Sequence, residues 1–215
     1  MPTYSPPTKT VGDVMNDVKR TFGDESGIVL EEDDIVRWIN TAAEEIVDRN
    51  YVLKARADLS TVSGQQEYPI QQLNIAEIDS VIIDNVAIQN VSFQQAQELL
   101  YDGRTPDEGG NPQIWWIFEG QLVFWPVPQG VNRITIFYSA KPRQVTNDPA
   151  LPLALPDKYY PRIVEHVLRS AYEMDEDWQA AQAKQAQYDA GINRMGQEER
   201  DAASAAYPFT TSLEW

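Results

Sequence analysis

Three groups of residues in this sequence could do chemistry, and the first contains its only histidine. A single histidine, His166, excludes a zinc site built from several imidazoles of one chain. The absence of cysteine excludes thiol catalysis, disulfides and cysteine-ligated metals. Because His166 precedes an inward-facing Val167 in a helical pattern, we interpret it as a boundary residue of a helical core. A triad with a serine and an acid stays formally open.

The acidic residues form the second group, but their spacing specifies no chemistry. Consecutive acids at Glu31–Asp34 point apart on a helical turn and lack the central glycine of a calcium loop, so we assign them to a helix N-terminus. A carboxylate-dependent hydrolase is an alternative function, since thirty-three acids always offer pairs. Phosphate-loop, metalloprotease and nucleophile-elbow motifs are missing, so we predict no enzyme, catalytic residue, metal or cofactor.

Tryptophans form the third group. Trp115, Trp116 and Trp125 could stack against sugar rings, so a carbohydrate-binding module is another alternative function. The strand-like segments Ile114–Phe118 and Leu122–Trp125 carry apolar side chains on both faces. Such a sheet must be covered twice, by a second sheet, by helices or by another subunit. We therefore count the three tryptophans as candidate partner-interface residues.

The C-terminal segment 203–215 is a second candidate partner interface. Its large apolar side chains are Tyr207, Phe209, Leu213 and Trp215. The segment contains no basic residue, and Pro208 disfavours a helix. A single extended segment of this length cannot form a hydrophobic core of its own. We expect it either to fold back over its own helices or to reach a neighbouring subunit as an added strand or aromatic anchor.

The charge of the chain is strongly acidic. Seventeen Lys and Arg oppose thirty-three Asp and Glu in 215 residues, which gives a formal net charge of −16. No basic run could neutralise phosphates, so we exclude tight DNA binding, although Arg104, or Lys54 with Arg56, could supply local cations. No apolar stretch approaches the length of a membrane span and no secretory signal pattern is present, so we expect a soluble protein with no membrane partner.

The period of the apolar residues divides the chain into parts. Helical spacing occupies residues 10–50 and 155–200, whereas short strands and one short helix occupy residues 51–145. Three prolines in residues 1–9 indicate an extended arm, and residues 203–215 an extended tail. We predict an α+β fold, in which two N-terminal and two C-terminal helices form a four-helix base. The β-rich excursion is inserted between helices two and three.

Several segments occur in a recognisable order over nearly the whole chain. They are the helix with Ile35–Asn40, then Gly64–Ile70, Ile78–Asn85, Pro112–Pro128 with Gly120 and Leu122 in place, and Leu155–Glu173 before a Gln-rich helix. Each motif alone consists of residue types that are common in turns and cores, but the motifs in this order are together fairly specific for one protein family. This order resembles the head-to-tail connector (adaptor) protein family of tailed bacteriophages.

The resemblance implies a non-enzymatic virion protein at the head–tail interface, present in the host cytoplasm during assembly. Members of that family usually form a ring of twelve copies beneath the portal protein. The ring extends the DNA channel and offers an attachment site to the tail or to a second adaptor or nozzle protein. Double-stranded DNA passes through without tight binding, and the acidic charge of this chain agrees with such sliding.

Overall fold

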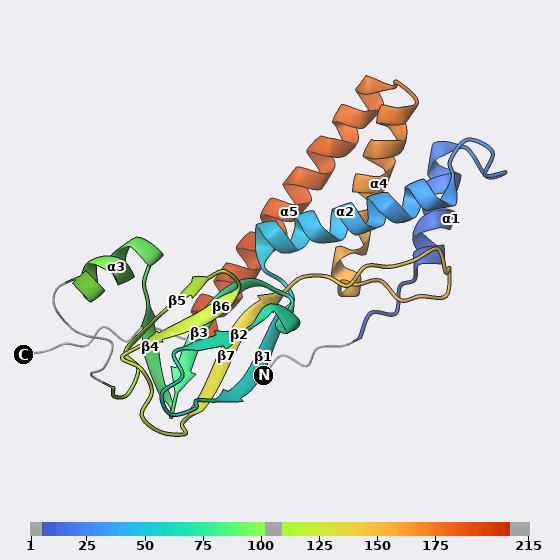
Figure 1. Cartoon of the computed structure of the whole chain (residues 1–215). Helices are drawn as coiled ribbons and strands as arrows, with labels where there is room; N and C mark the ends of the chain where they lie inside the picture. The colour runs from blue at the N-terminus through green and yellow to red at the C-terminus, as the bar shows by residue number, and fades with distance from the viewer. Residues whose placement is uncertain (1–5, 102–108, 207–215) are drawn as a thin grey trace, which may run out of the picture. The chain divides into compact units, whose positions relative to one another are not determined.

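The computed structural model describes residues 6–101 and 109–206 and has a mixed α+β fold, which confirms the predicted fold class. The chain divides into two compact units (Figure 1). The first, here called the helical unit, comprises the chain up to Asn50 and from Pro142 onward. The second, here called the β unit, is Tyr51–Lys141. The four large apolar residues of the tail, at 207, 209, 213 and 215, lie outside the described residues.

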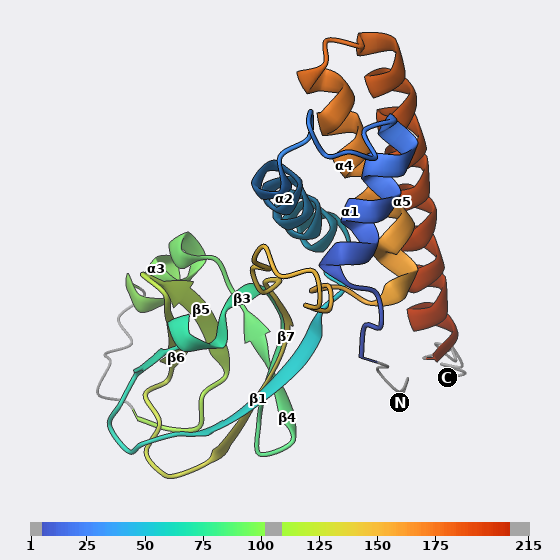
Figure 2. The ribbon, with the colours of Figure 1, turned by 90° about the vertical axis from the view of Figure 1, so that its right-hand side faces the viewer.

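The described part of the helical unit contains four α-helices. They are α1 (Val11–Phe22), α2 (Glu32–Asn50), α4 (Tyr160–Met174) and α5 (Trp178–Ala206), with a 3-10 turn, η2 (Asp157–Tyr159), before α4. Helix α4 packs against α1, α2 and α5 (Figure 2). Its buried side chains include Ile163, Val167 and Ala171, whose spacing of four residues places them on one face.

Local sequence signals set the helix ends. At the start of α1, Thr10 Oγ1 accepts a hydrogen bond from the Asp13 N–H at 3.2 Å, and Asp13 Oδ2 accepts one from the Thr10 N–H at 3.0 Å. Gly23 ends α1 with a φ of +89°, in the left-handed region that favours glycine. At the start of α5, Asp177 Oδ1 accepts from the Ala180 N–H at 3.0 Å.

Helix α5 is longer than the sequence analysis predicts. We expected the helical base to end at residue 200 and the extended tail to begin at residue 203, whereas α5 continues to Ala206. The physical reason lies in the composition of residues 202–206, which are alanines and one serine and contain no helix breaker. The first strong breaker is Pro208.

Seven described strands form one curled sheet in the β unit, in the order β1-β7-β3-β4-β5-β6-β2. They are β1 (Lys54–Ser60), β2 (Glu67–Pro69), β3 (Ile75–Ile83), β4 (Val86–Asn90), β5 (Ile114–Phe118), β6 (Gln121–Trp125) and β7 (Arg133–Ala140). A 3-10 turn, η1 (Gln71–Leu73), precedes β3, and helix α3 (Phe93–Tyr101) follows β4. Neighbouring strands are antiparallel except β4 and β5, which run parallel because α3 lies in the connection between them.

The sheet has an apolar core on each face, which explains why β5 and β6 do not alternate apolar with polar residues. The core inside the curl contains Trp115, Leu122, Phe124, Ile134 and Ile136. The core on the other face contains Ile114, Trp116, Val123 and Trp125, packed with Ala96 and Leu100 of α3. The sequence leaves three kinds of cover open, and two of them are present. The sheet curls over its own inner face, and helix α3 covers the other face.

Candidate functional site

The three tryptophans singled out in the sequence are buried in the β unit. Trp115, Trp116 and Trp125 are 2%, 5% and 7% exposed. The indole N–H of Trp115 donates to the Ile88 carbonyl oxygen at 3.2 Å. The rings fill the two cores of the sheet within one chain, and their contact with a partner stays a prediction. With so little of each ring exposed, the three tryptophans form no exposed platform for stacking against sugars, so the carbohydrate-binding alternative has no structural support.

Apolar side chains that the sequence analysis missed are exposed beside these cores. Ile117 and Phe118, at the end of β5, are 47% and 42% exposed. The Phe118 ring stacks on the ring of Phe93 from α3, with 4.7 Å between their centroids. The alternation of β5 could not reveal these two residues, because both of its faces are apolar along the whole strand. They form a candidate contact surface within the β unit.

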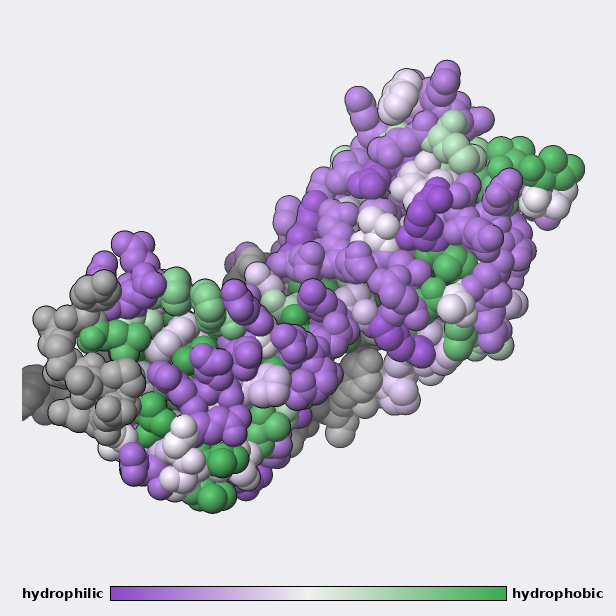
Figure 3. Space-filling model, viewed as in Figure 1, coloured by the Kyte–Doolittle hydropathy of each residue, from purple (hydrophilic) through white to green (hydrophobic). Residues whose placement is uncertain are grey.

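The loop between α1 and α2 is a second exposed apolar feature. Ile28 and Val29 are 84% and 49% exposed, and Figure 3 shows apolar surface at the tip of the helical unit where this loop lies. The buried Asp24 carboxylate accepts hydrogen bonds from the N–H groups of Leu30, Ile28 and Val29 at 2.8, 3.0 and 2.9 Å. These bonds, led by the one from Leu30, lower the pKa of Asp24. Asp24 therefore fixes the backbone that holds Ile28 and Val29 in solvent.

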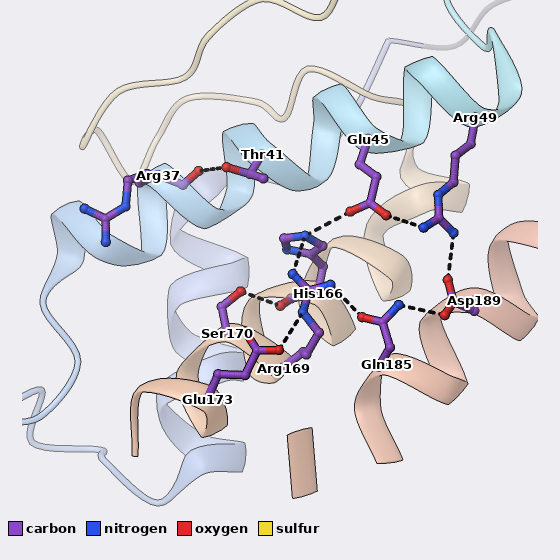
Figure 4. A network of polar contacts seen from close by, with 10 residues as sticks. All are labelled: Arg37, Thr41, Glu45, Arg49, His166, Arg169, Ser170, Glu173, Gln185 and Asp189. Carbon is purple, nitrogen blue, oxygen red and sulfur yellow. Dashed lines mark hydrogen bonds and ion pairs between the residues drawn. The ribbon is translucent and has the colours of Figure 1, made fainter. Parts of the chain in front are cut away.

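A polar network joins α2, α4 and α5 around His166 (Figure 4). His166 Nε2 lies 3.2 Å from Glu45 Oε2 and 3.2 Å from a guanidinium nitrogen of Arg169. The network continues through Gln185, Asp189 and Arg49 back to Glu45. The residues of this network therefore hold three helices of the helical unit together through charge-assisted hydrogen bonds.

The surroundings of His166 are those of a structural histidine. It is 1% exposed, so it lies inside the core and not at its boundary. Burial lowers the pKa of His166 to about 4, and the positive charges of Arg169 and Arg49 act in the same direction. The nearby Ser170 donates its hydroxyl to the His166 carbonyl oxygen and not to the imidazole. The geometry shows no activated nucleophile at this serine.

The acids that begin α2 serve the helix and its neighbours. Glu32 pairs with Lys19 at 3.0 Å, and Asp34 pairs with Arg37 at 2.6 Å. Among residues 6–101 and 109–206, no group of three or more His, Asp or Glu side chains could hold a metal ion. Within the same ranges, the helices are too short or too polar to cross a membrane.

Two of the three candidate cation positions lie beside acids. Lys54 Nζ is 2.8 Å from Asp79, and an Arg56 nitrogen is 2.9 Å from Asp58. Hydrogen bonds from Arg56, Thr135 and Arg133 lower the pKa of Asp58 to about 2. Both cations are thus offset locally by carboxylates. The third candidate, Arg104, lies outside the described residues.

The fold is that of a two-unit α+β protein, and apolar side chains are exposed in both units. The family model of the SU10 adaptor protein matches residues 9–211, and the chain belongs to this family of phage head–tail adaptors. It is therefore a structural component of a phage virion that associates with other head or tail proteins. This result confirms the resemblance found in the sequence and is consistent with a non-enzymatic role. A comparison with curated proteins gave no match.

Proposed function

We propose that this protein is a head-to-tail adaptor that forms a ring of twelve copies beneath the portal protein. The observation that carries this proposal is the family match over residues 9–211, nearly the whole chain. In this role the ring extends the DNA channel and offers an attachment site to the tail or to a second adaptor or nozzle protein. The copies assemble in the host cytoplasm and then remain in the virion at the head–tail interface.

Each part of the chain has a role in this proposal. The helical unit is the four-helix base, and its support is the packing of α4 against three other helices. The β unit is the excursion between α2 and α4. Ile28 and Val29 in the base, and Ile117 and Phe118 in the excursion, supply exposed apolar area that neighbours in an assembly would cover.

The decisive test of the ring is its copy number. The protein is co-expressed with the portal protein of the same virion, and the copies bound per portal are counted by native mass spectrometry and by electron microscopy. The expected result is one ring of twelve copies on each portal. A copy number far from the portal stoichiometry, in virions or in the reconstituted complex, refutes the proposal.

A pair of variants tests whether the α1–α2 loop contributes to the assembly. Ile28→Ser removes the most exposed apolar side chain of the loop (84%), and Val131→Ser removes one of similar exposure (78%) in the β unit. We expect the first variant to reduce the number of copies bound to the portal and the second to leave it unchanged. Equal behaviour of the two variants would show that the loop is not a contact surface.

DNA is expected to pass through the ring without tight binding. The support is the net charge of −16 on each copy, together with the pairing of Lys54 and Arg56 to acids. We expect no saturable binding of a fluorescent duplex by the assembled ring at about 50 mM salt, where phosphate contacts are strong. Tight binding that weakens steeply as salt is added would contradict this part of the proposal.

The tail residues Tyr207, Phe209, Leu213 and Trp215 are proposed as an anchor to a neighbouring subunit. Buried aromatic anchors contribute about 2 kcal/mol or more each at protein interfaces. A chain truncated after Ala206 should keep the circular dichroism spectrum of the full chain and fail to join the complex. An unfolded truncation, or one that joins normally, would show that the tail is not the anchor.

A further inference from the structure

A cleft of about 410 Å³ opens in the β unit between β3 and β5. Its walls include Ile75, Ile78, Trp115 and Ile117, with Asn90 and Lys141 among the polar residues around them. Trp115 is almost fully buried although it lines the cleft, whereas Ile117 is about half exposed. The cleft therefore offers an apolar lining that is open to solvent, as binding clefts commonly do.

Unpaired strand edges flank this cleft because β4 is short. Strand β3 has nine residues, but β4 pairs only with its last three, Val81–Ile83. Strand β4 then pairs with β5 through Gln89 and Asn90 alone. In the part of the chain that the structure describes, no strand pairs with the cleft-side edge of residues 75–80 of β3 or of residues 116–118 of β5.

Such edges are templates for another strand. Their free backbone N–H and C=O groups can extend the sheet by strand addition. Two register shifts between β3 and β7, at residues 75–77 and 78–80, fall in the same half of β3. Bulges of this kind are common at sheet edges and beside functional sites. Both the edges and the apolar lining thus suit an extended segment with one apolar face.

The C-terminal sequence has the pattern of such a segment. Its odd-numbered residues are Tyr207, Phe209, Thr211, Leu213 and Trp215. Its even-numbered residues are Pro208, Thr210, Ser212 and Glu214. An alternation of period two places the apolar side chains on one face of a strand, and aromatic residues and threonine favour strands.

The length of the segment also fits. Nine residues follow Ala206, the last described residue of α5, and nine residues in extended form span roughly 30 Å. This is longer than the six-residue edge of β3, which needs roughly 20 Å. The cleft is lined by one cation, Lys141, and one acid, Glu77, so Glu214, the only acid of the segment, has one oppositely charged residue available there.

We propose that residues 207–215 of one copy bind as an added strand in the β3–β5 cleft of the adjacent copy. The proposal rests on the ring proposed above and names the partner of the tail. Each copy then donates one strand and receives one, which is a head-to-tail contact that closes in a ring. The odd-numbered side chains lie against the apolar lining, and the backbone pairs with the free edges.

Disulfide trapping tests this contact, and the absence of native cysteine makes the trap specific. One chain carries Ile117→Cys, and a second carries a tail cysteine at Phe209, Thr211 or Leu213, one position at a time. The two chains are mixed, assembled with the portal and oxidised mildly, and a parallel sample is oxidised without the portal. A disulfide needs Cα atoms within about 7 Å, so a cross-link reports close approach.

The matched control carries Val86→Cys, which is 65% exposed in β4 of the same unit and does not line the cleft. We expect at least one tail position to give about tenfold more cross-linked dimer with residue 117 than with residue 86, because bound segments have a high effective concentration. Equal yields for the two positions at every tail cysteine overturn the proposal.

The remaining outcomes separate this contact from the ring itself. A chain with both cysteines that forms an internal disulfide would show that the tail occupies its own cleft, and this also overturns the proposal. A cross-link from the tail to the portal does the same. A full ring on the portal without the residue 117 cross-link refutes the tail contact alone. The cross-link without a ring supports the tail contact and refutes the proposed function.

Discussion

His166 allows a sharp test of how the helical unit responds to pH. The imidazole faces Glu45 and Arg49 of α2, Arg169 of its own helix and, edge to face at 5.4 Å, the ring of Tyr188 from α5. Burial lowers its pKa from 6.5 to about 4, and the two arginines add to the shift. The Glu45 carboxylate favours the protonated form and acts against them.

The sign of the effect follows from proton linkage. In the unfolded chain His166 gains its proton near pH 6.5, whereas in the folded chain it gains it only near pH 4. Between these values the unfolded state binds more protons, so stability falls as the pH is lowered. The two pKa values give a loss of about 2 kcal/mol in the free energy of unfolding between pH 7 and pH 5.

Other titrating groups act mainly outside this window. Hydrogen bonds lower the pKa values of Glu32, Asp157 and Asp189, so their stabilisation is complete above the unfolded-state pKa near 4 and is lost only in stronger acid. Burial raises the pKa of Glu165, which acts in the opposite direction to His166. All four groups are present both in the natural chain and in a variant that lacks only His166, so a comparison of these two proteins isolates the effect of His166.

The comparison sets the natural chain against His166→Gln, which keeps a polar side chain and cannot titrate. Urea unfolding at pH 7 and pH 5, followed by circular dichroism at 222 nm, gives the loss of stability for each protein. We expect the loss to be about 2 kcal/mol smaller in the variant. Equal losses in the two proteins, or an imidazole proton resonance of this only histidine that titrates near pH 6.5, would refute the reasoning.

Three further substitutions test other parts of the fold. Thr10→Ala removes the hydrogen bond that Thr10 Oγ1 accepts in the capping box. We expect the free energy of unfolding, measured by thermal unfolding, to fall by about 1 kcal/mol, and no change would mean that the cap is dispensable. Tyr188→Phe removes a buried hydroxyl without a hydrogen-bond partner among the described residues, so the free energy of unfolding should change by less than about 1 kcal/mol. Leu122→Ala empties a fully buried site in the inner core, and urea unfolding followed by tryptophan fluorescence should show a loss of about 3 kcal/mol.

Local signals in the sequence predicted local structure well. The helix N-terminus predicted at the acids Glu31–Asp34 is present, because α2 begins at Glu32 and such a signal depends on residues close in the chain. The end of α5 was misplaced, since alanine continues a helix until a breaker occurs. Such errors of a few residues at element ends are expected where the composition changes gradually.

The burial of the tryptophans could not be read from the sequence. Apolar residues on both faces of β5 and β6 correctly require two covers, but the pattern does not say which element supplies the second. Helix α3 supplies it, through Ala96 and Leu100, and these residues would suit a helix packed on any apolar surface. The position of α3 depends on pairing between strands distant in the chain, and periodicity carries no information about that pairing.

The same helix determines where the sheet stays open. Ser92 and Gln95 form its capping box, in which the Ser92 N–H donates to Gln95 Oε1 at 2.9 Å and the Gln95 N–H donates to Ser92 Oγ at 3.2 Å. Because the helix must begin directly after Ser92, β4 ends at Asn90 and pairs with only part of β3 and β5. A longer β4 would complete the sheet and remove the unpaired edges. The residues that start α3 therefore also preserve the cleft in which the added strand is proposed to bind.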